Sequence, residues 1–523
     1  MNAFSRGKIG DLLHAVKPPH VIDVPEASRI TVHAAVSRFS VLYEKVRNAV
    51  DYKDDHLFRK AAIVRILKRL LVLETDAEHI AQHVIRELIA ARYLPNGTLP
   101  ESLFSEVAIR ITKYQVLKKA NIGSEKHERW ILGMIASEIE ESVNDHQQET
   151  AFIHFLYEQI ADRITIKGLA IPDDIRRLQI YIAVVRCLSK ADDEMLSHRL
   201  IRSFQPEWLE PEKWVHDPNA MAKAMVQADR DIHTSLNHPL AQKFSQAVKP
   251  WAISLTILRD ALKEKPTEAA RLLEHTDDLF ALVERIAERR YKDSRDKLRR
   301  GTFRAIIYLF ATKMIFALAI EIPLELLLYS EVHVLALAVN LAFPPILMFL
   351  VGSLIKLPGK ENIVKIKRGV EELLSVDGPK GFEIRVASSR KGFAGFLFHL
   401  VYLLTFFLTF GLVYQGLHLL NFTWVSTSIF IFFLCIVSFF AFRLRLGARE
   451  YVVVGRLERF TNVVLDFFSL PILRAGQWLS RSISRINIFI FLFDFVIEAP
   501  FKIFLNVMEE WFAYMKEKRE ELQ

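Results

Sequence analysis

The stretch AIIYLFATKMIFALAIEIPLELLLY, residues 305–329, decides the fold class of this chain. It is long and apolar enough to cross a lipid bilayer as a helix, which takes roughly 20 apolar residues. Residues 332–355 follow after a short turn and have the same character, and residues 393–420 and 422–442 form a second such pair. The sequence therefore predicts an integral membrane protein with four spans, arranged as two helical hairpins.

Basic residues are distributed unevenly around these spans. Residues 284–304 carry nine Lys or Arg against four acids, and residues 356–391 carry nine against five. The turns 330–333 and 418–423 carry no Lys or Arg. Because Lys and Arg accumulate on the cytoplasmic side of membrane proteins, we predict cytoplasmic termini and a plasma membrane, or bacterial inner membrane, location. We expect the basic segments beside the spans to contact an anionic inner leaflet. Binding to nucleic acid is a less favoured explanation of the net charge of +8.

Residues 1–300 contain no stretch of this kind, and their apolar residues recur at the spacing of amphipathic helices, as Ile80, Val84 and Leu88 do. Helices are predicted at 32–50, 57–73, 77–94, 102–119, 128–141, 148–164, 173–189 and 220–236. No alternating run in this part suggests a sheet. The predicted fold class is all-α, and a helical-repeat solenoid remains an alternative form of the N-terminal domain.

The predicted organisation follows from these segments. Its parts are an extended lead-in (1–30), a cytosolic helical domain (31–265), a charged connector helix (266–304), a first transmembrane hairpin (305–355), a cytosolic basic loop module with a helix at 361–375 and a strand at 382–387 (356–392), a second transmembrane hairpin (393–442), and membrane-surface amphipathic helices with a charged tail (443–523).

The chain lacks the local motifs of nucleotide binding, Rossmann chemistry, zinc proteolysis and serine hydrolysis. Only two cysteines occur, so neither a disulfide framework nor a Cys-based zinc site is expected. His79, His83 and Glu87 share one helix face and are the nearest approach to a metal site, although a polar surface face explains them better. We therefore predict no cofactor and favour a protein that is not an enzyme.

Ionisable residues inside the first hairpin form the candidate functional site. Such residues are costly in a bilayer and tend to be paired or functional. The predicted site consists of Lys313, Glu321, Glu325, Asn340, Pro344 and Pro345. Lys313 lies ~12 Å from Glu321 along a helix axis, so either its partner lies elsewhere or its side chain extends toward the inner membrane surface. The glutamates either reach the outer headgroups, which we favour, or line a path for ions or solutes.

The C-terminal part is apolar but carries regularly spaced charges. Asp494, Glu498 and Lys502 recur every four residues and form a polar stripe on a helix rich in Phe and Ile. Such a stripe is typical of a helix that lies in the membrane interface. A fifth crossing at 486–508 is the alternative.

Two functions are consistent with these features. We favour a non-enzymatic scaffold or recruitment protein, with a cytosolic protein partner, whose helical domain and membrane-surface helices organise other molecules. The alternative is a channel or transporter subunit that uses the first hairpin and, with only four spans, requires a homo-oligomer. An enzyme acting on lipid lacks a recognisable catalytic group.

Overall fold

A computed structural model of the chain describes most of the residues on which these predictions depend. The described ranges are 28–32, 55–120, 123–144, 146–355, 358–375, 377–386, 393–448, 451–453 and 460–485, with a few isolated positions near both ends. Nearly all of the predicted helix at 32–50, and the whole stripe of Asp494, Glu498 and Lys502, lie outside the described residues.

The chain divides into two compact units. The first consists of Met1–Glu274, Gly369–Arg385 and Phe491–Gln523, and the second of His275–Arg368 and Val386–Ile490.

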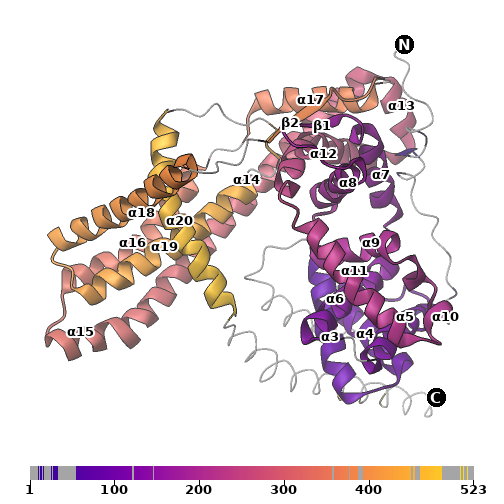
Figure 1. The fold of residues 1–523 in the computed structure, drawn as a ribbon, viewed down its shortest axis with the longest axis horizontal. Helices are drawn as coiled ribbons and strands as arrows, with labels where there is room; N and C mark the ends of the chain where they lie inside the picture. The colour runs from indigo at the N-terminus through magenta and orange to yellow at the C-terminus, as the bar shows by residue number, and fades with distance from the viewer. Residues whose placement is uncertain are drawn as a thin grey trace. The chain divides into compact units, whose positions relative to one another are not determined.

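Helices build nearly all of the described part of the first unit (Figure 1). The helices are α3 (Asp55–Leu73), α4 (Ala77–Ala90), α5 (Ser102–Lys119), α6 (Glu125–Val143), α7 (Gln147–Ile160), α8 (Asp173–Ser189), α9 (Asp193–Phe204), α10 (Pro211–Trp214), α11 (Pro218–Leu236), α12 (Ala241–Glu264) and α13 (Ala269–Glu274), with the 3-10 turns η3 (Pro206–Leu209) and η4 (Pro266–Glu268). The predicted helical class is confirmed for these residues. Helices α9, α10 and α12 were not predicted.

The expectation of no sheet in the N-terminal domain is wrong in one place. Strand β1 (Ile164–Lys167) pairs in parallel with β2 (Phe382–Arg385), so that Ile164 lies opposite Phe382. The sequence prediction extended a helix to residue 164, whereas α7 ends at Ile160. A strand of four residues is too short to show an alternating pattern, which explains why β1 was missed, whereas β2 corresponds to the strand predicted at 382–387.

The pairing brings a late segment of the chain into the first unit. The N–H of Phe382 donates to the carbonyl oxygen of Arg163 at 2.8 Å, and Ile384 is buried. Residue Gly369 lies so close to α12 that a Cβ atom there would be 2.2 Å from Oγ of Ser254. Residues 369–385 of the segment predicted as a basic loop module between the hairpins therefore belong to the helical domain.

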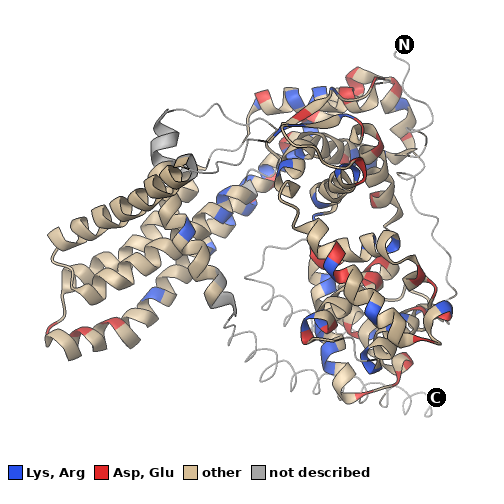
Figure 2. Ribbon diagram, in the orientation of Figure 1, with Lys and Arg blue, Asp and Glu red and all other residues tan. Residues whose placement is uncertain are grey.

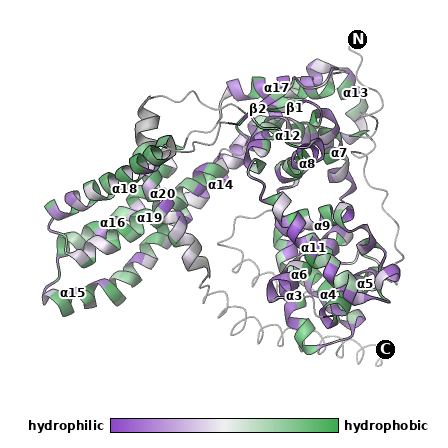
Figure 3. Ribbon diagram, viewed as in Figure 1, coloured by the Kyte–Doolittle hydropathy of each residue, from purple (hydrophilic) through white to green (hydrophobic). Residues whose placement is uncertain are grey.

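The second unit contains the four predicted spans. Its elements are α14 (Thr276–Phe316), the π-helix η5 (Ala317–Glu321), α15 (Ile322–Tyr329), α16 (Val334–Leu354), the first part of α17 (Lys360–Leu374), α18 (Phe393–Leu419), α19 (Trp424–Ala448) and α20 (Phe460–Arg485). Among the residues that the structure describes, four helical segments are long and apolar enough to cross a membrane: 276–329, 334–353, 396–419 and 424–446. Figure 3 shows the apolar character of α15, α16, α18 and α19. The transmembrane prediction is supported at this level.

Tight turns join the helices of each hairpin. Ser330 and Asn421 adopt left-handed backbone conformations, with φ of 58° and 55°, and they end α15 and α18. Helix α14 packs along α16, and α16 packs against α19. We refer to the end that contains these turns as the turn end of the bundle, and to the end near Arg304 and Arg443 as the arginine end.

Helix α14 continues from a polar segment into the first span without interruption. Residues 276–304 of the predicted connector and the start of the first span are therefore one helix, Thr276–Phe316, which carries Lys and Arg along the part that precedes the span (Figure 2). The first residues of the predicted connector instead form η4 and α13. The side chain of Asn362 fastens two other segments to this helix. Its Nδ2 donates to the Tyr291 hydroxyl at 2.5 Å and to the carbonyl oxygen of Tyr451 at 2.8 Å, while its Oδ1 accepts the N–H of Val453 at 2.7 Å.

Candidate functional site: a polar cluster inside the membrane bundle

Lys313 and Glu321 form an ion pair inside the first span. The ammonium nitrogen of Lys313 lies 3.1 Å from Oε2 of Glu321, and the two side chains are 0% and 1% exposed. The same nitrogen lies 4.4 Å from the ring centroid of Phe433 on α19. Pairing with a carboxylate and with the face of an aromatic ring compensates a buried ammonium for its lost hydration.

The prediction that Lys313 lies too far from Glu321 to pair with it is wrong, and the π-helix gives one reason. Residues eight apart on a regular α-helix are roughly 80° apart around its axis. The five residues Ala317–Glu321 form a π-helix, which has more residues per turn and rotates Glu321 back toward the face of Lys313. The prediction also used only the distance between the two backbone positions, whereas the long side chains of Lys313 and Glu321 extend along the helix axis.

Asn340 connects this ion pair to two other helices. From α16, its Nδ2 donates to Oε1 of Glu321 at 2.5 Å and to the carbonyl oxygen of Ser426 on α19 at 3.2 Å. Asn340 is 1% exposed. Because each buried polar group that loses its partner costs free energy, this arrangement favours a fixed position of the three helices.

Glu325 is the second enclosed carboxylate, and it accepts hydrogen bonds from three donors. The backbone N–H of His333 donates to Oε2 at 3.0 Å, while the hydroxyls of Thr423 and Ser426 donate to Oε1 at 3.0 Å and 2.6 Å. Glu325 is 1% exposed. The expectation that Glu321 and Glu325 reach the outer headgroups is therefore wrong, because both carboxylates point into the bundle.

Two helix N-termini meet at the Glu325 carboxylate. His333 is the residue that precedes α16, and Thr423 accepts the N–H of Ser426 in the first turn of α19. Helix N-termini carry a partial positive charge and unpaired N–H groups, so they stabilise a carboxylate. The cluster thus contains one ammonium group and two carboxylates. The ammonium group pairs with Glu321, and the partial positive charge at the two helix N-termini faces the carboxylate of Glu325.

We call this set of side chains the intramembrane polar cluster. It consists of Lys313, Glu321, Glu325, Asn340, Thr423 and Ser426. The structure thus brings together the four polar residues predicted for the site. Pro344 and Pro345 lie inside α16 and take no part in these hydrogen bonds.

Sequence reasoning missed Thr423 and Ser426, which belong to the second hairpin. A threonine just before an apolar run, with a serine three residues later, is the pattern of a helix N-cap and could have located this end of α19. The pattern contains nothing to indicate that the same hydroxyls contact a carboxylate about 100 residues earlier, since Ser426 and Glu325 are 101 residues apart. That contact depends on how the hairpins pack.

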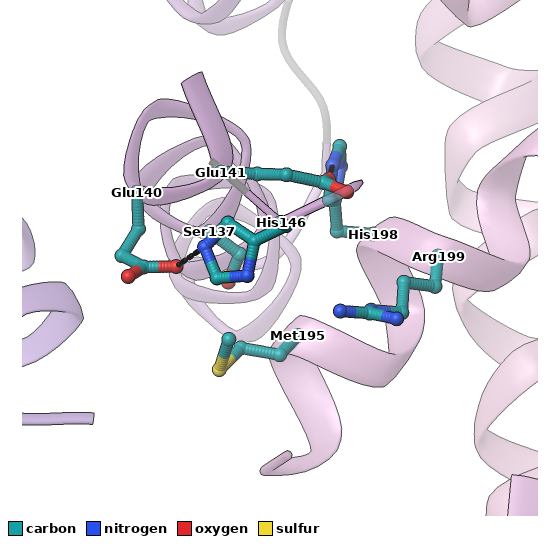
Figure 4. Close-up of a pocket in the computed structure, with 7 residues that line it drawn as sticks. All are labelled: Ser137, Glu140, Glu141, His146, Met195, His198 and Arg199. Carbon is teal, nitrogen blue, oxygen red and sulfur yellow. Dashed lines mark hydrogen bonds and ion pairs between the residues drawn. The ribbon is translucent and has the colours of Figure 1, made fainter. Parts of the chain in front are cut away.

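A second polar network lies in the first unit, around a small pocket lined by Ser137, Glu140, Glu141, His146, Met195, His198 and Arg199 (Figure 4). His146 lies 3.1 Å from Glu140 and 3.5 Å from Glu149, and Arg199 lies 3.0 Å from Glu149. His198 lies 2.6 Å from Glu141. Acids and bases alternate, so the charges in this interior are compensated.

These ion pairs displace the pKa values of the groups involved. Hydrogen bonds to Glu140 and Glu149 raise the pKa of His146 to about 9. Burial alone would raise the pKa of Glu141, but its hydrogen bond to His198 and the nearby charges of His198, Arg199 and Arg202 together outweigh burial and lower this pKa to about 2. The pKa of Glu149 is likewise lowered to about 2, because its contacts with His146 and Arg199 outweigh its burial. Glu141, His146 and Glu149 are therefore ionised near neutral pH.

The weak metal candidate does not form a site in this structure. The rings of His79 and His83 are in edge-to-face contact, with centroids 4.5 Å apart, but the Glu87 carboxylate pairs with Arg69 at 2.5 Å. Glu74 contacts His79 instead. Within the part of the chain that the structure describes, no three His, Cys, Asp or Glu side chains cluster so as to hold a metal ion.

No family model, curated protein or solved structure matches this chain.

Proposed function

We propose that the chain is a multi-pass membrane protein that does not conduct ions or solutes, and whose helical domain recruits or organises protein partners in the cytoplasm. The enclosure of Lys313, Glu321 and Glu325 carries the proposal. These charged side chains are at most 1% exposed, and their hydrogen bonds go to the protein itself. Groups that guide ions or solutes need water or substrate beside them.

The alternative proposal is a channel or transporter subunit built from the first hairpin in an oligomer. The π-helix Ala317–Glu321 favours it, because single π turns in membrane helices often occur at functional positions. In that case the cluster would open in a second conformation. The two proposals make different predictions for Glu321→Gln.

A flux assay separates them. We expect proteoliposomes containing the wild-type chain to leak protons, sodium and potassium no faster than protein-free vesicles. The variant Glu321→Gln should leave this background unchanged, although it removes the ion pair with Lys313. Ion flux above background that disappears in Glu321→Gln would establish the alternative.

Recruitment is testable at exposed apolar positions of the helical domain. Leu209 and Val215 are each 44% exposed. A photo-reactive amino acid at either position, in intact cells, should form adducts with one recurring protein, and the same residue at the exposed Glu212 serves as the matched control. Adducts with many proteins in equal amounts, or none, would contradict a recruitment function.

The proposed orientation places the turn end of the bundle outside and both termini in the cytoplasm, as the charge distribution indicates. Glu331 and Leu420 lie in the two turns and are exposed, and Lys360 lies at the start of α17. In a background with Cys187 and Cys435 replaced by serine, cysteines at 331 and 420 should react with an impermeant thiol reagent in intact cells. A cysteine at 360 should react only after permeabilisation, and the opposite pattern would reverse the orientation.

A further inference from the structure

Helix α20 packs closely against the two spans of the second hairpin. A Cβ atom at Gly476 would lie 2.1 Å from the carbonyl oxygen of Cys435 and 2.8 Å from Cβ of Phe439, both on α19. The guanidinium carbon of Arg474 lies 6.0 Å from the ring centroid of Tyr402 on α18. Only glycine permits this approach, so Gly476 fixes where α20 crosses α19.

The two contacts place α20 at one depth in the bundle. Cys435 lies eight residues from Arg443, and Tyr402 lies nine residues from Phe393, the first residue of α18. At 1.5 Å per residue, both are about 12–14 Å from the arginine end of their helices. Because the hydrocarbon core of a bilayer is roughly 30 Å thick, this depth lies on the arginine-end side of the bilayer, close to its midplane.

Helix α20 runs across the spans rather than alongside them. Figure 1 shows it crossing α18 and α19 at a steep angle, and the structure packs it against both. It does not have the composition of a spanning helix. Its side chains Phe467, Leu470 and Trp478 are 41%, 50% and 67% exposed. Large apolar side chains exposed at this depth would contact acyl chains.

We propose that α20 lies in the plane of one leaflet and makes the protein prefer membranes that curve toward that leaflet. A helix of 26 residues is about 39 Å long and about 10 Å wide, so it occupies on the order of 400 Å² in that leaflet. Four upright helices of the same width occupy on the order of 300 Å² in each leaflet. The protein therefore fills about twice the area in the leaflet at the arginine end, which is the geometry of a wedge.

The ligand of this surface is the lipid bilayer itself, in a state of positive curvature. A helix inserted into one leaflet binds more favourably where the lipids of that leaflet are spread apart, as on the outer surface of a small vesicle. Arg474 is exposed beside Tyr402 and can extend its guanidinium toward the headgroups at the arginine end, as long basic side chains do near an interface. This inference is independent of the proposed recruitment function.

Reconstitution of the full-length chain into small and large vesicles of the same lipid mixture tests the proposal. We expect a protein-to-lipid ratio at least about twofold higher in the small vesicles, among molecules whose arginine end faces outward. The variant Gly476→Leu, which forces α20 away from Cys435, should remove this preference. Gly411→Leu on α18 is the matched control, because nothing lies within 4 Å of a Cβ at Gly411.

A measurement of the depth of α20 in the membrane, made on a chain that keeps Gly476, tests the proposal even if Gly476→Leu unfolds. A spin label on Trp478→Cys, with Cys187 and Cys435 replaced by serine, should relax through collisions with oxygen more than with a water-soluble nickel complex. Equal distribution of the wild type between small and large vesicles would overturn the proposal. So would a label at 478 that is accessible mainly from water, or a curvature preference that Gly476→Leu leaves intact.

Discussion

Replacing Lys313 by methionine should destabilise the membrane bundle by about 3–5 kcal/mol, the usual cost of leaving one member of a buried ion pair without its partner. Methionine has nearly the length of lysine, so packing against Phe433 is retained while the charge is lost. Glu321 would then keep only its hydrogen bond from Asn340 and the neighbouring Ser426 hydroxyl. The effect is measured as the free energy of unfolding in a fixed detergent or lipid mixture.

The double variant separates a charge effect from a packing effect. Lys313→Met combined with Glu321→Gln leaves no uncompensated charge, so it should recover most of the stability lost in Lys313→Met. Lys297→Met is the matched control, because Lys297 is an exposed lysine on the same helix. If Lys313→Met costs no more than Lys297→Met, the ion pair does not stabilise the bundle.

The helical domain should be most stable between about pH 4.5 and pH 6.5, and should lose stability on both sides of this range. The pKa values of Glu141 and Glu149 are lowered to about 2, so their contribution is present above their usual pKa near 4.5 and is lost as the pH falls toward 2. The pKa of His146 is raised to about 9, so its contribution is complete below 6.5 and is lost as the pH rises toward 9.

The variant His146→Gln isolates the alkaline side of this profile. Each unit of pKa shift corresponds to about 1.4 kcal/mol, so the loss between pH 6.5 and 9 should be on the order of 2–3 kcal/mol for the wild type and close to zero for the variant. Urea unfolding followed by the fluorescence of the buried Trp208 and Trp214 measures it. His154→Gln, at a 71% exposed histidine on the same helix, should keep the wild-type profile.

Much of the fold could be predicted from the sequence because the signals were local. Helices α5 and α8 begin and end at the predicted residues, since their apolar residues repeat over four or more turns. The four spans were found from length and composition alone. Strand β1 was not predicted, because its pairing with β2 depends on residues more than 200 positions away.

The candidate site was predicted in its members but not in its geometry. Lys313, Glu321, Glu325 and Asn340 are conspicuous because polar groups are rare in apolar spans. The partners of these residues could not be predicted. The π-helix that aligns Lys313 with Glu321 has no sequence pattern of its own, and the contact of Glu325 with Ser426 joins separate hairpins. Local periodicity does not report such contacts.

The contacts of Glu325 also constrain the order in which the parts of the protein can pack during synthesis. The first hairpin leaves the ribosome before Thr423 and Ser426 have been synthesised. Of these three donors, Glu325 at first has only the N–H of His333, which belongs to its own hairpin. Asn362 likewise cannot form its hydrogen bonds with Tyr451 and Val453 until these residues, which follow the last span, have been synthesised. A chain truncated before residue 423 would hold a carboxylate in the bilayer without its hydroxyl partners, and a cell's membrane quality control could recognise it as incomplete. The hydrogen bonds of Glu325 in the first hairpin are therefore complete only after the second hairpin has been synthesised.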